Sequence, residues 1–438
     1  MNPNRSRGAK PKHAHAQQRV LEGRVRDVTD TGDSVVETEQ GVVLVPGGLP
    51  DEQVRVRSEH TRAGVARGVL LAVLTPSPER ITPACAITER CGGCPLMSLE
   101  LTAQRRLKQR RVERALEGVL AEGVTVQPET SGPVLGYRRR ARLAFRKVGR
   151  GFALGYFAHG SHHVVDVAAC PVLTPALEAA LVHVRTCLGP KLSGTGAIDL
   201  DGIDAQGVHV AVRCDEAVAP EVYRACEQLA TLAPIVGASL AIGDGAPARF
   251  GAEVSASLAH DGIPLVIPKH GFSQVNSDVN TRLSALVLAL AEPAAVRVLE
   301  LYAGYGNFTL TLAEQASALL AVESDPRGAD ACRENLRSRA RDHARVMAAD
   351  VRTLSLRERF DVLVLDPPRG GCPTLAALVA QARPTRVVYI SCHMSTLQRD
   401  VRALHAAGYV VDRAHALDMF PQTGHVEALV RMRRAETP

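Results

Sequence analysis

Strands and helices alternate regularly along residues 269–438 of this chain. Short apolar runs are followed, one after another, by stretches in which apolar residues recur with helical spacing. The expected strands are 296–302, 319–323, 345–348, 361–365, 386–390, 410–416 and 426–431. The expected helices are 308–314, 326–339, 374–382 and 395–407. This alternation predicts a doubly wound α/β fold, in which helices cover both faces of a largely parallel sheet.

Cys392 lies at the end of the expected strand 386–390, just before the helix 395–407. Open parallel sheets bind their ligands at the carboxyl ends of the strands, so this thiol stands where chemistry is expected. A single cysteine can equally be a small buried hydrophobic residue. The residues expected at the same edge of the sheet therefore indicate whether Cys392 is a catalytic thiol or a packing residue.

A glycine-containing turn follows the first strand and includes Gly304 and Gly306. Glycine lets the backbone approach a ligand closely at the N-terminus of a helix. Glu323 ends the next strand, where a carboxylate can accept hydrogen bonds from both hydroxyls of a ribose. The third glycine of a dinucleotide fingerprint is missing, and an acid, Glu300, precedes the turn. The pattern favours a nucleoside ligand such as S-adenosylmethionine over NAD, with a purely structural turn as the alternative.

The segment Asp366-Pro367-Pro368-Arg369 leaves the strand before Cys392, and its two prolines predict a rigid loop that positions a planar base. Such loops also serve methylation of exocyclic amines, so the loop alone does not choose between nitrogen and carbon. Cys392 favours carbon, because a thiolate that adds to C6 of uracil turns the weakly nucleophilic C5 into an enolate carbon that can attack a methyl donor. The C5 proton must then leave, and Glu427 is the candidate base.

Two histidines lie close to these residues in the sequence. His393 and the N-terminus of the helix that follows it are expected to favour the thiolate form of Cys392. His425 is interpreted as a structural residue. For Glu427 the alternative interpretation is an ordinary glutamate on the surface of a strand.

The N-terminal part predicts a different architecture. Residues 1–17 lack apolar periodicity and are expected to form a disordered basic tail. Five short β-like runs within 18–76 predict a small closed barrel with an OB-like fold, because closure removes exposed sheet edges. Residues 77–268 mix both element types and are expected to form a central α+β domain. Within it, 99–120 has the pattern of an amphipathic helix whose basic residues face away from its apolar stripe and which packs on the C-terminal domain.

Composition places the chain among globular proteins, with 46% apolar and 22% charged residues. The net charge of +6 is modest, but basic residues cluster in 1–20, 105–114 and 137–150. Such clusters fit a polyphosphate partner, and a solvated arginine-rich face is the alternative. No apolar run is long enough for a membrane span and no signal peptide is recognised, so a cytoplasmic location without a membrane partner is expected.

Several C-terminal segments together resemble the RNA 5-methyluridine methyltransferase family. They are Phe272-x-Gln274, Leu301–Leu310, Asp366–Arg369, Ser391-Cys392 with Thr396-Leu397, and Asp418-x-Phe420-Pro421-Gln422-Thr423-x-His425-Val426-Glu427. The resemblance implies a class I, Rossmann-like methyltransferase domain that uses S-adenosylmethionine, with Cys392 as nucleophile and Glu427 as base. It places a further set of residues at the S-adenosylmethionine pocket: Gln274, Tyr302, Asn307, Glu323 and Asp366. The chain departs from the family pattern at His393-Met394, where Asn-Pro is usual.

The resemblance extends over nearly the whole chain. The barrel 18–76 resembles the TRAM domain, an RNA-binding module. The cysteines that resemble the [4Fe-4S] ligands of the family's 23S rRNA branch are Cys85, Cys91, Cys94 and Cys170. Four thiolates are equally suited to zinc, so the sequence leaves the metal open. The cysteines without a motif are expected to be packing residues: Cys187, Cys214, Cys226, Cys332 and Cys372.

Methylation of uracil C5 in RNA is therefore the predicted function, with 23S rRNA as the expected substrate. The alternatives are a tRNA uridine methyltransferase, an RNA cytosine-C5 methyltransferase and a non-catalytic RNA-binding protein. Cytosine enzymes typically carry a second cysteine in the loop that here holds Asp366–Arg369, and a pure binder has no need of Cys392 and Glu427. The target uridine and the oligomeric state stay open, with a monomer favoured.

Overall fold

The computed structural model describes residues 19–62, 64–149, 151–203, 207–252, 256–258, 263–268 and 273–435. The predicted tail 1–17 and Phe272 lie outside these residues. The chain forms two compact units, and each is considered separately. One comprises residues up to Thr82 together with Ser98–Glu100, and the other comprises Pro83–Met97 and Leu101–Pro438.

The N-terminal unit is a closed barrel, as predicted. Among the described residues its strands are β1 (Arg19–Val28), β2 (Asp33–Thr38), β3 (Gly41–Pro46), β4 (Gln53–Arg62) and β5 (Val65–Thr75), in the order β1-β2-β3-β5-β4. Alternate valines of these strands fill its interior, including Val25, Val36 and Val54. The buried carboxylate of Glu52 accepts a hydrogen bond from Nε of Arg80 at 2.7 Å, which fixes the segment that leaves the barrel.

The central part of the second unit contains a mixed sheet with the order β13-β12-β11-β10-β7-β8-β9 among the described strands. Their bounds are β7 (Arg140–Val148), β8 (Gly151–Phe157), β9 (Val164–Asp166), β10 (Gly194–Ile203), β11 (Gly207–Cys214), β12 (Ile235–Ile242) and β13 (Ala248–Gly251). Helices α2 (Pro175–Cys187) and α3 (Pro220–Leu229) bury their apolar sides in the core of this sheet. A separate hairpin pairs β14 (Ala256–Leu258) with β15 (Pro264–Val266).

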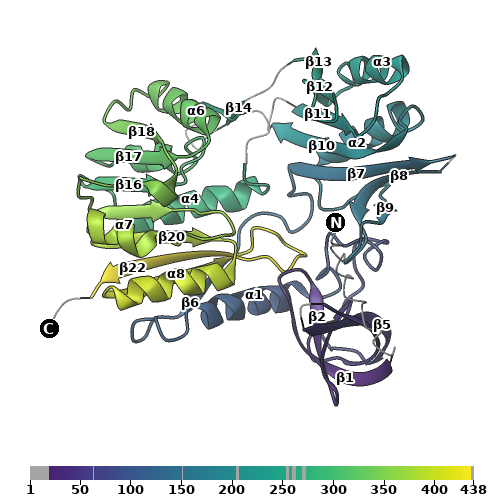
Figure 1. The fold of residues 1–438 in the computed structure, drawn as a ribbon, viewed down its shortest axis with the longest axis horizontal. Coiled ribbons are helices and arrows are strands. Elements are labelled where there is room, and N and C mark those ends of the chain that lie inside the picture. The colour runs from purple at the N-terminus through teal and green to yellow at the C-terminus, as the bar shows by residue number, and fades with distance from the viewer. Residues whose placement is uncertain are drawn as a thin grey trace, which may run out of the picture. The chain divides into compact units, whose positions relative to one another are not determined.

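The predicted doubly wound sheet is present in the C-terminal part (Figure 1). Its order among the described strands is β18-β17-β16-β19-β20-β22-β21-β6. The strands are β6 (Val126–Glu129), β16 (Arg297–Leu301), β17 (Ala318–Glu323), β18 (Ala344–Ala348), β19 (Val362–Leu365), β20 (Arg386–Ser391), β21 (Tyr409–Leu417) and β22 (Glu427–Arg434). Strands β16 to β20 are parallel, whereas β22 is antiparallel to both β20 and β21.

Both faces of this sheet are covered, which explains why its central strands are continuous apolar runs. Helices α4 (Ser277–Ala291), α5 (Thr309–Ala313) and α6 (Pro326–Arg337) pack on one face, where side chains such as Val364 and Ile390 point. Helices α1 (Leu101–Ala115), α7 (Leu375–Ala382) and α8 (Met394–Ala406) pack on the other, with Leu365 and Tyr389. A short 3-10 turn, Val351–Thr353, precedes β19. No helix in the described part of the chain is long and apolar enough to cross a membrane.

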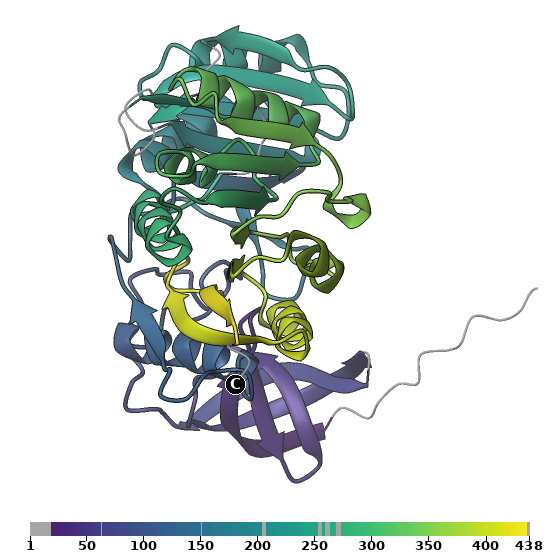
Figure 2. The same ribbon diagram turned by 90° about the vertical axis from the view of Figure 1, so that its left-hand side faces the viewer.

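Helix α1 joins the C-terminal core although it lies far away in the sequence. It runs beside α8 (Figures 1 and 2), and Val112 and Leu116 enter the core of the sheet. The expectation that its basic residues face away from the packed side is wrong for two of them, because Lys108 and Arg111 are buried. They contact the segment between β21 and β22, which offers backbone carbonyls and the carboxylate of Asp418.

Candidate active site

Three strand ends bring Asp366, Cys392 and Glu427 to one edge of the sheet. Asp366 follows β19 and Cys392 follows the neighbouring parallel strand β20. Strand β22 begins with Glu427, and its antiparallel register pairs Ser391 with Ala428. The next pair in this register is Cys392 with Glu427, and directly opposed residues have Cα atoms about 5 Å apart. The sheet therefore places the thiol beside one carboxyl group and next to the strand end that carries the other.

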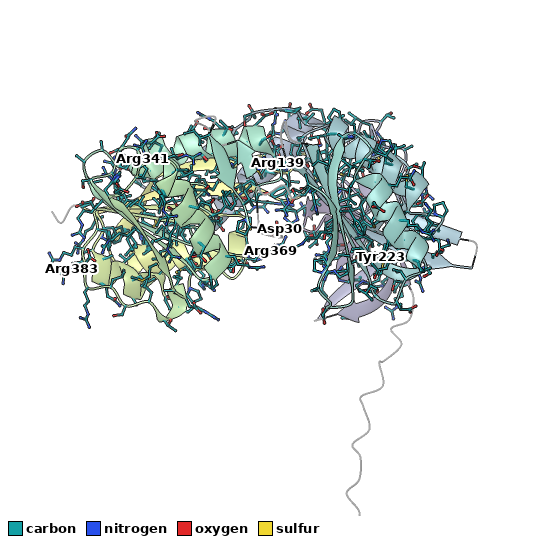
Figure 3. The ribbon with its side chains drawn as sticks, turned by 90° about the horizontal axis from the view of Figure 1, so that it is seen from above. Asp30, Arg139, Tyr223, Arg341, Arg369 and Arg383 are labelled. Carbon is teal, nitrogen blue, oxygen red and sulfur yellow. The ribbon has the colours of Figure 1, made fainter. Side chains whose placement is uncertain are left out.

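The charges at this edge act against ionisation of the thiol. Burial raises the pKa of Cys392 to about 11, and the carboxyl groups of Glu427 and Asp366 add to the rise. The exposed guanidinium of Arg369, labelled in Figure 3, lowers this pKa. Desolvation and the two facing acids therefore set the net rise in the pKa of Cys392, and the contribution expected of His393 and the helix N-terminus stays a prediction.

The two carboxyl groups also favour their neutral forms. Glu427 is buried, and both desolvation and the proximity of Asp366 raise its pKa well above the usual value. Desolvation raises the pKa of Asp366 as well. Groups with perturbed pKa values that gather at a strand edge are typical of catalytic sites.

Helix α8 fixes the loop that follows Asp366. Asp400 is buried, and its Oδ2 accepts hydrogen bonds from the backbone N–H of Cys372 and the hydroxyl of Tyr389, both at 2.7 Å. Thr396 donates its hydroxyl to the carbonyl of Arg369 at 3.1 Å. These contacts tie the Asp366–Arg369 loop to the helix that begins just after Cys392, so the two parts of the site move as one body.

The glycine turn and the end of β17 form a second part of the site. Gly304 donates its N–H to Oε2 of Glu323 at 2.8 Å, and Asp325 donates its N–H to Oε1 at 2.7 Å. Gly304 and Gly306 have φ angles of 57° and 100°, which glycine adopts without strain. Tyr302 has a φ of 62°, a strained conformation for a residue with a side chain. Oε1 also accepts a hydrogen bond from the hydroxyl of Ser324 at 3.2 Å. The turn is therefore held in one shape, and Oε2 of Glu323 keeps acceptor capacity for a ligand.

Glu300 lies just below this turn and is almost fully buried, at 2% exposure. Its Oε2 atom has no hydrogen-bond partner among the described residues. Desolvation raises its pKa to about 8, which favours the protonated carboxyl group near neutral pH. An unpartnered buried oxygen of this kind is suited to a group that a ligand brings with it.

Gln274 and Asn307 approach the site from other elements. Gln274 is buried, and its backbone carbonyl accepts a hydrogen bond from Nε of Arg139 at 3.0 Å. The side-chain amides of Asn307 and Asn280 exchange two hydrogen bonds of 3.0 Å. Asn280 belongs to α4, a helix that the sequence analysis did not predict. The signal for it was present, since Asn276 caps the helix and apolar residues follow with helical spacing.

The two histidines have different surroundings. His393 is half-buried, and its Nδ1 lies 3.2 Å from the hydroxyl oxygens of both Ser395 and Thr396 in the first turn of α8. His425 packs edge-on against Phe420, with 5.8 Å between the ring centroids. His425 thus has a structural contact, and His393 takes part in the loop that follows Cys392.

A cavity in the central part is lined by all four predicted metal-ligand cysteines, Cys85, Cys91, Cys94 and Cys170, with apolar side chains around them. Burial raises the pKa of Cys94 to about 12, and the proximity of the other three thiols contributes. The hydroxyl of Tyr156 lines the same cavity and has no partner among the described residues. In the described part of the chain, however, no group of three or more metal-ligating side chains already stands in binding positions.

Part of the basic cluster 137–150 has internal roles. Arg138 lines the cysteine cavity, and Arg139 holds the 273–275 segment through the carbonyl of Gln274. Arg140 and Arg142 form ion pairs with Asp201 and Asp199 of the neighbouring strand at 3.2 and 3.6 Å. Only some of the basic residues counted in the sequence are therefore available to hold phosphates.

Comparison with known proteins connects this geometry to a family. Residues 263–435 match the family model described as tRNA (uracil-5-)-methyltransferase. A 23S rRNA (uracil(1939)-C(5))-methyltransferase RlmD of Chromohalobacter salexigens is 35% identical over 90% of this chain and 85% of its own. The protein of the same name from Pseudomonas putida is 37% identical over 88% of this chain and 87% of its own.

The fold has a counterpart among solved structures. The tRNA (uracil-54, C5)-methyltransferase of Pyrococcus abyssi, in complex with S-adenosyl-L-homocysteine, superimposes with a TM-score of 0.74. That likeness covers 94% of this chain and 100% of the other at 24% identity, which shows a shared fold. The sequence identity to the curated relatives over most of both chains establishes the family. The chain belongs to the RNA uracil-C5 methyltransferases, in the branch that includes the 23S rRNA enzymes.

Proposed function

We propose that this protein transfers a methyl group to C5 of a uracil in RNA, and that its substrate is 23S rRNA. The observation that carries the proposal is the pairing of Ser391 with Ala428 across β20 and β22, which sets Cys392 beside Glu427 at the edge that also holds Asp366. A nucleophile and a base on adjacent strands can reach C6 and C5 of one pyrimidine ring. The high identity to the 23S rRNA enzymes over nearly the whole chain supports the choice of RNA.

The reaction follows from the two side chains. The thiol of Cys392 loses its proton to solvent and forms a bond to C6, and the electrons of the C5–C6 double bond become available at C5. C5 can then take up the methyl group as the donor's S–CH3 bond breaks and leaves a neutral thioether. The carboxylate of Glu427 then removes the C5 proton, the double bond re-forms and the C6–S bond breaks. Burial raises the pKa of Glu427, so its carboxylate form, which must be present for this step, is a stronger base than an exposed carboxylate.

A pocket for S-adenosylmethionine fits the turn beside this pair. We assign Glu323 to the ribose, and Gln274, Tyr302, Asn307 and Asp366 to the remainder of the pocket. The unpartnered Oε2 of Glu300 and the glycine turn at the helix end support a site for a polar nucleoside. S-adenosylmethionine would supply the methyl group on a sulfonium, whose positive charge suits an edge lined by acids.

Cytosine methylation is less well supported by the loop after β19. Cys372 is the cysteine nearest to the Asp366–Arg369 segment, and it is only 1% exposed. Its Sγ lies 3.8 Å from the hydroxyl oxygen of Thr374, and its backbone is held by Asp400. A thiol enclosed in this way does not present itself to a base that enters the site.

We propose that the four cysteines bind a [4Fe-4S] cluster. The supporting observations are the cavity that all four line and the rise that burial and the neighbouring thiols cause in the pKa values of Cys94 and Cys170. Metal coordination removes such a rise by deprotonating the thiols. Protein purified without oxygen is expected to contain about four iron atoms per chain. A Cys94→Ser variant should lose them and a Cys187→Ser variant should keep them. Stoichiometric zinc in place of iron would contradict the proposal.

The barrel and the outward-facing basic residues are assigned to RNA binding. We propose that residues 18–76 are a TRAM-like module, that 77–268 form the central domain with the cysteine site, and that 269–438 form the methyltransferase domain, to which α1 and β6 contribute. Ribosomal RNA as substrate places the protein in the cytoplasm. These assignments explain why a methyltransferase carries so much chain outside its sheet.

The substrate assignment is tested with purified protein, methyl-labelled S-adenosylmethionine and two RNAs. Unmodified 23S rRNA is expected to acquire 5-methyluridine at a single position, whereas an unmodified tRNA pool should remain unlabelled. The label is located by digestion and mass spectrometry of the nucleosides and fragments. Labelling of tRNA but not of 23S rRNA would overturn the choice of substrate, and 5-methylcytidine would overturn the choice of base.

A further inference from the structure

The segment 418–424, which connects β21 to β22 and leads directly to Glu427, is held by α1 through buried polar contacts. Sheet pairing begins only at Glu427, which pairs with Leu417, so the sheet does not fix the residues between them. Polar contacts hold the connecting segment instead, among them those of Gln104 and Lys108, which are 1% and 2% exposed. Both lie on the same side of α1, four residues apart. The hydroxyl of Tyr137 also donates to the carbonyl of Pro421 at 3.0 Å.

Gln104 forms a reciprocal pair with Gln422. Its Oε1 accepts a hydrogen bond from the backbone N–H of Gln422 at 3.0 Å, and its Nε2 donates to Oε1 of Gln422 at 2.9 Å. The same Nε2 donates to the carbonyl of Leu96 at 3.0 Å. Leu96 in turn donates its N–H to the carbonyl of Gln422 at 3.0 Å. Gln104 thus closes a network in which both backbone groups of Gln422 are engaged.

The backbone of Gln422 needs this network. Its φ angle of 71° lies in the left-handed region, which is unfavourable for a residue with a side chain. Strained conformations of this kind persist only where the surroundings impose them, and they concentrate at functional sites. Gln422 is nearly buried, so its polar groups have no water to replace the contacts with Gln104 and Leu96.

Lys108 and Arg111 hold the two ends of the same segment. Nζ of Lys108 donates to Oδ1 of Asp418 and, at 2.9 Å, to the carbonyl of Phe420. Nη1 of Arg111 donates to the carbonyl of Gly424, three residues before Glu427. A buried ion pair fixes geometry more than it stabilises the fold, since desolvation offsets much of its attraction.

We infer that Gln104 and Lys108 are positioning residues that set the carboxylate of Glu427 against the C5 proton of the substrate. This inference rests on the proposed role of Glu427 as base. Neither residue reaches the strand edge itself, and both act through the connecting segment 418–424. A carboxylate displaced by about 1 Å loses most of its effect in proton removal, whereas the thiol of Cys392 sits on another strand and keeps its position.

The inference predicts a specific kinetic defect for Gln104→Met, which keeps the side-chain length and removes both hydrogen-bonding groups. Addition of Cys392 and arrival of the methyl group should continue, while loss of the C5 proton becomes slow. We expect kcat to fall roughly ten- to a hundredfold with little change in KM for the RNA. A covalent protein–RNA complex that resists denaturing gels should accumulate. A merely destabilised protein would lose kcat without trapping RNA.

Gln109→Met is the matched control, because Gln109 lies on the same helix but donates its side-chain amide to Val126 and Glu113 instead. This variant should have the same kcat as the unsubstituted protein and should trap no RNA. Gln422→Met removes the same side-chain pair from the other side, leaves α1 intact and should trap RNA as Gln104→Met does. Circular dichroism and thermal melting show whether Gln104→Met is folded. If it is not, Gln422→Met still provides the test.

The outcomes separate two failures. Suppose that Glu427→Gln forms the covalent RNA adduct but neither Gln104→Met nor Gln422→Met does. This result overturns the positioning role and leaves the assignment of Glu427 as base standing. Absence of adduct with Glu427→Gln as well overturns the base assignment and, with it, the inference. The positioning role is supported if Gln104→Met and Gln422→Met both trap RNA and Gln109→Met traps none.

Discussion

A Glu427→Gln protein is expected to stop after methyl transfer and remain bound to its RNA through the Cys392–C6 bond. The amide is isosteric with the acid but cannot accept the C5 proton, and without loss of that proton the C6–S bond cannot break. Glu427 lies on β22, one residue beyond the Ser391–Ala428 pair, so the substitution leaves the thiol of Cys392 in place. It also removes a carboxyl group that raises the pKa of Cys392, which favours the nucleophile. We expect turnover to fall by roughly 10²- to 10⁴-fold. A slowly migrating protein–RNA band on denaturing gels measures the trapped complex.

Glu334→Gln provides the control for this substitution, since Glu334 is an exposed residue of α6 on the opposite side of the sheet from α8. It should turn over normally and give no band. Normal turnover by Glu427→Gln would show that another group removes the proton.

Replacement of the thiol in Cys392→Ala should abolish methylation. C5 of uracil is too weakly nucleophilic to be methylated without covalent addition at C6, so we expect activity to fall by roughly 10⁴-fold or more. Cys392 is only half-buried, so its removal leaves no large cavity. The S-adenosylmethionine pocket assigned to Glu323 and the glycine turn comes from other strands. Calorimetry should therefore show unchanged S-adenosylmethionine binding.

Cys187→Ala is the matched thiol control, because Cys187 is half-buried in α2 of the central part. It should retain full activity and binding. Retained methylation by Cys392→Ala would contradict the nucleophile assignment, and loss of S-adenosylmethionine binding would show that the substitution damages the pocket instead.

Much of the sheet could be predicted because its strands are buried on both faces. Residues such as Val364 and Leu365 point to opposite cores, and this makes each strand a continuous apolar run bounded by polar turns. Asp366 and Cys392 could be brought together from the sequence for the same reason, since parallel strands end at one edge. Glu427 joins them because β22 is antiparallel and begins at that edge. The raised pKa of Cys392 could not be predicted from the sequence, because it depends on which carboxyl groups face the thiol once the strands are assembled.

The parts that escaped prediction depend on contacts between distant segments. Strand β6 has only four residues, includes Pro128 and is ordered by pairing with β21 near the other end of the chain. Gln104 contacts Gln422 across 318 positions. On a helical pattern Lys108 looks like a solvent-facing base, and only the folded chain shows that it faces the carboxylate of Asp418. Helix α4 was missed although its cap and apolar spacing were readable.

The most direct test of the mechanism is the mass of the peptide that carries Cys392 in the complex trapped by Glu427→Gln. After digestion of protein and RNA, that peptide should carry a nucleotide with a methylated uracil, and the peptides with Cys372 and Cys332 should be unmodified. This result would establish thiol addition at Cys392 and methyl transfer before proton loss in one measurement. A Cys392 peptide of unaltered mass, or a nucleotide attached to another cysteine, would contradict the account.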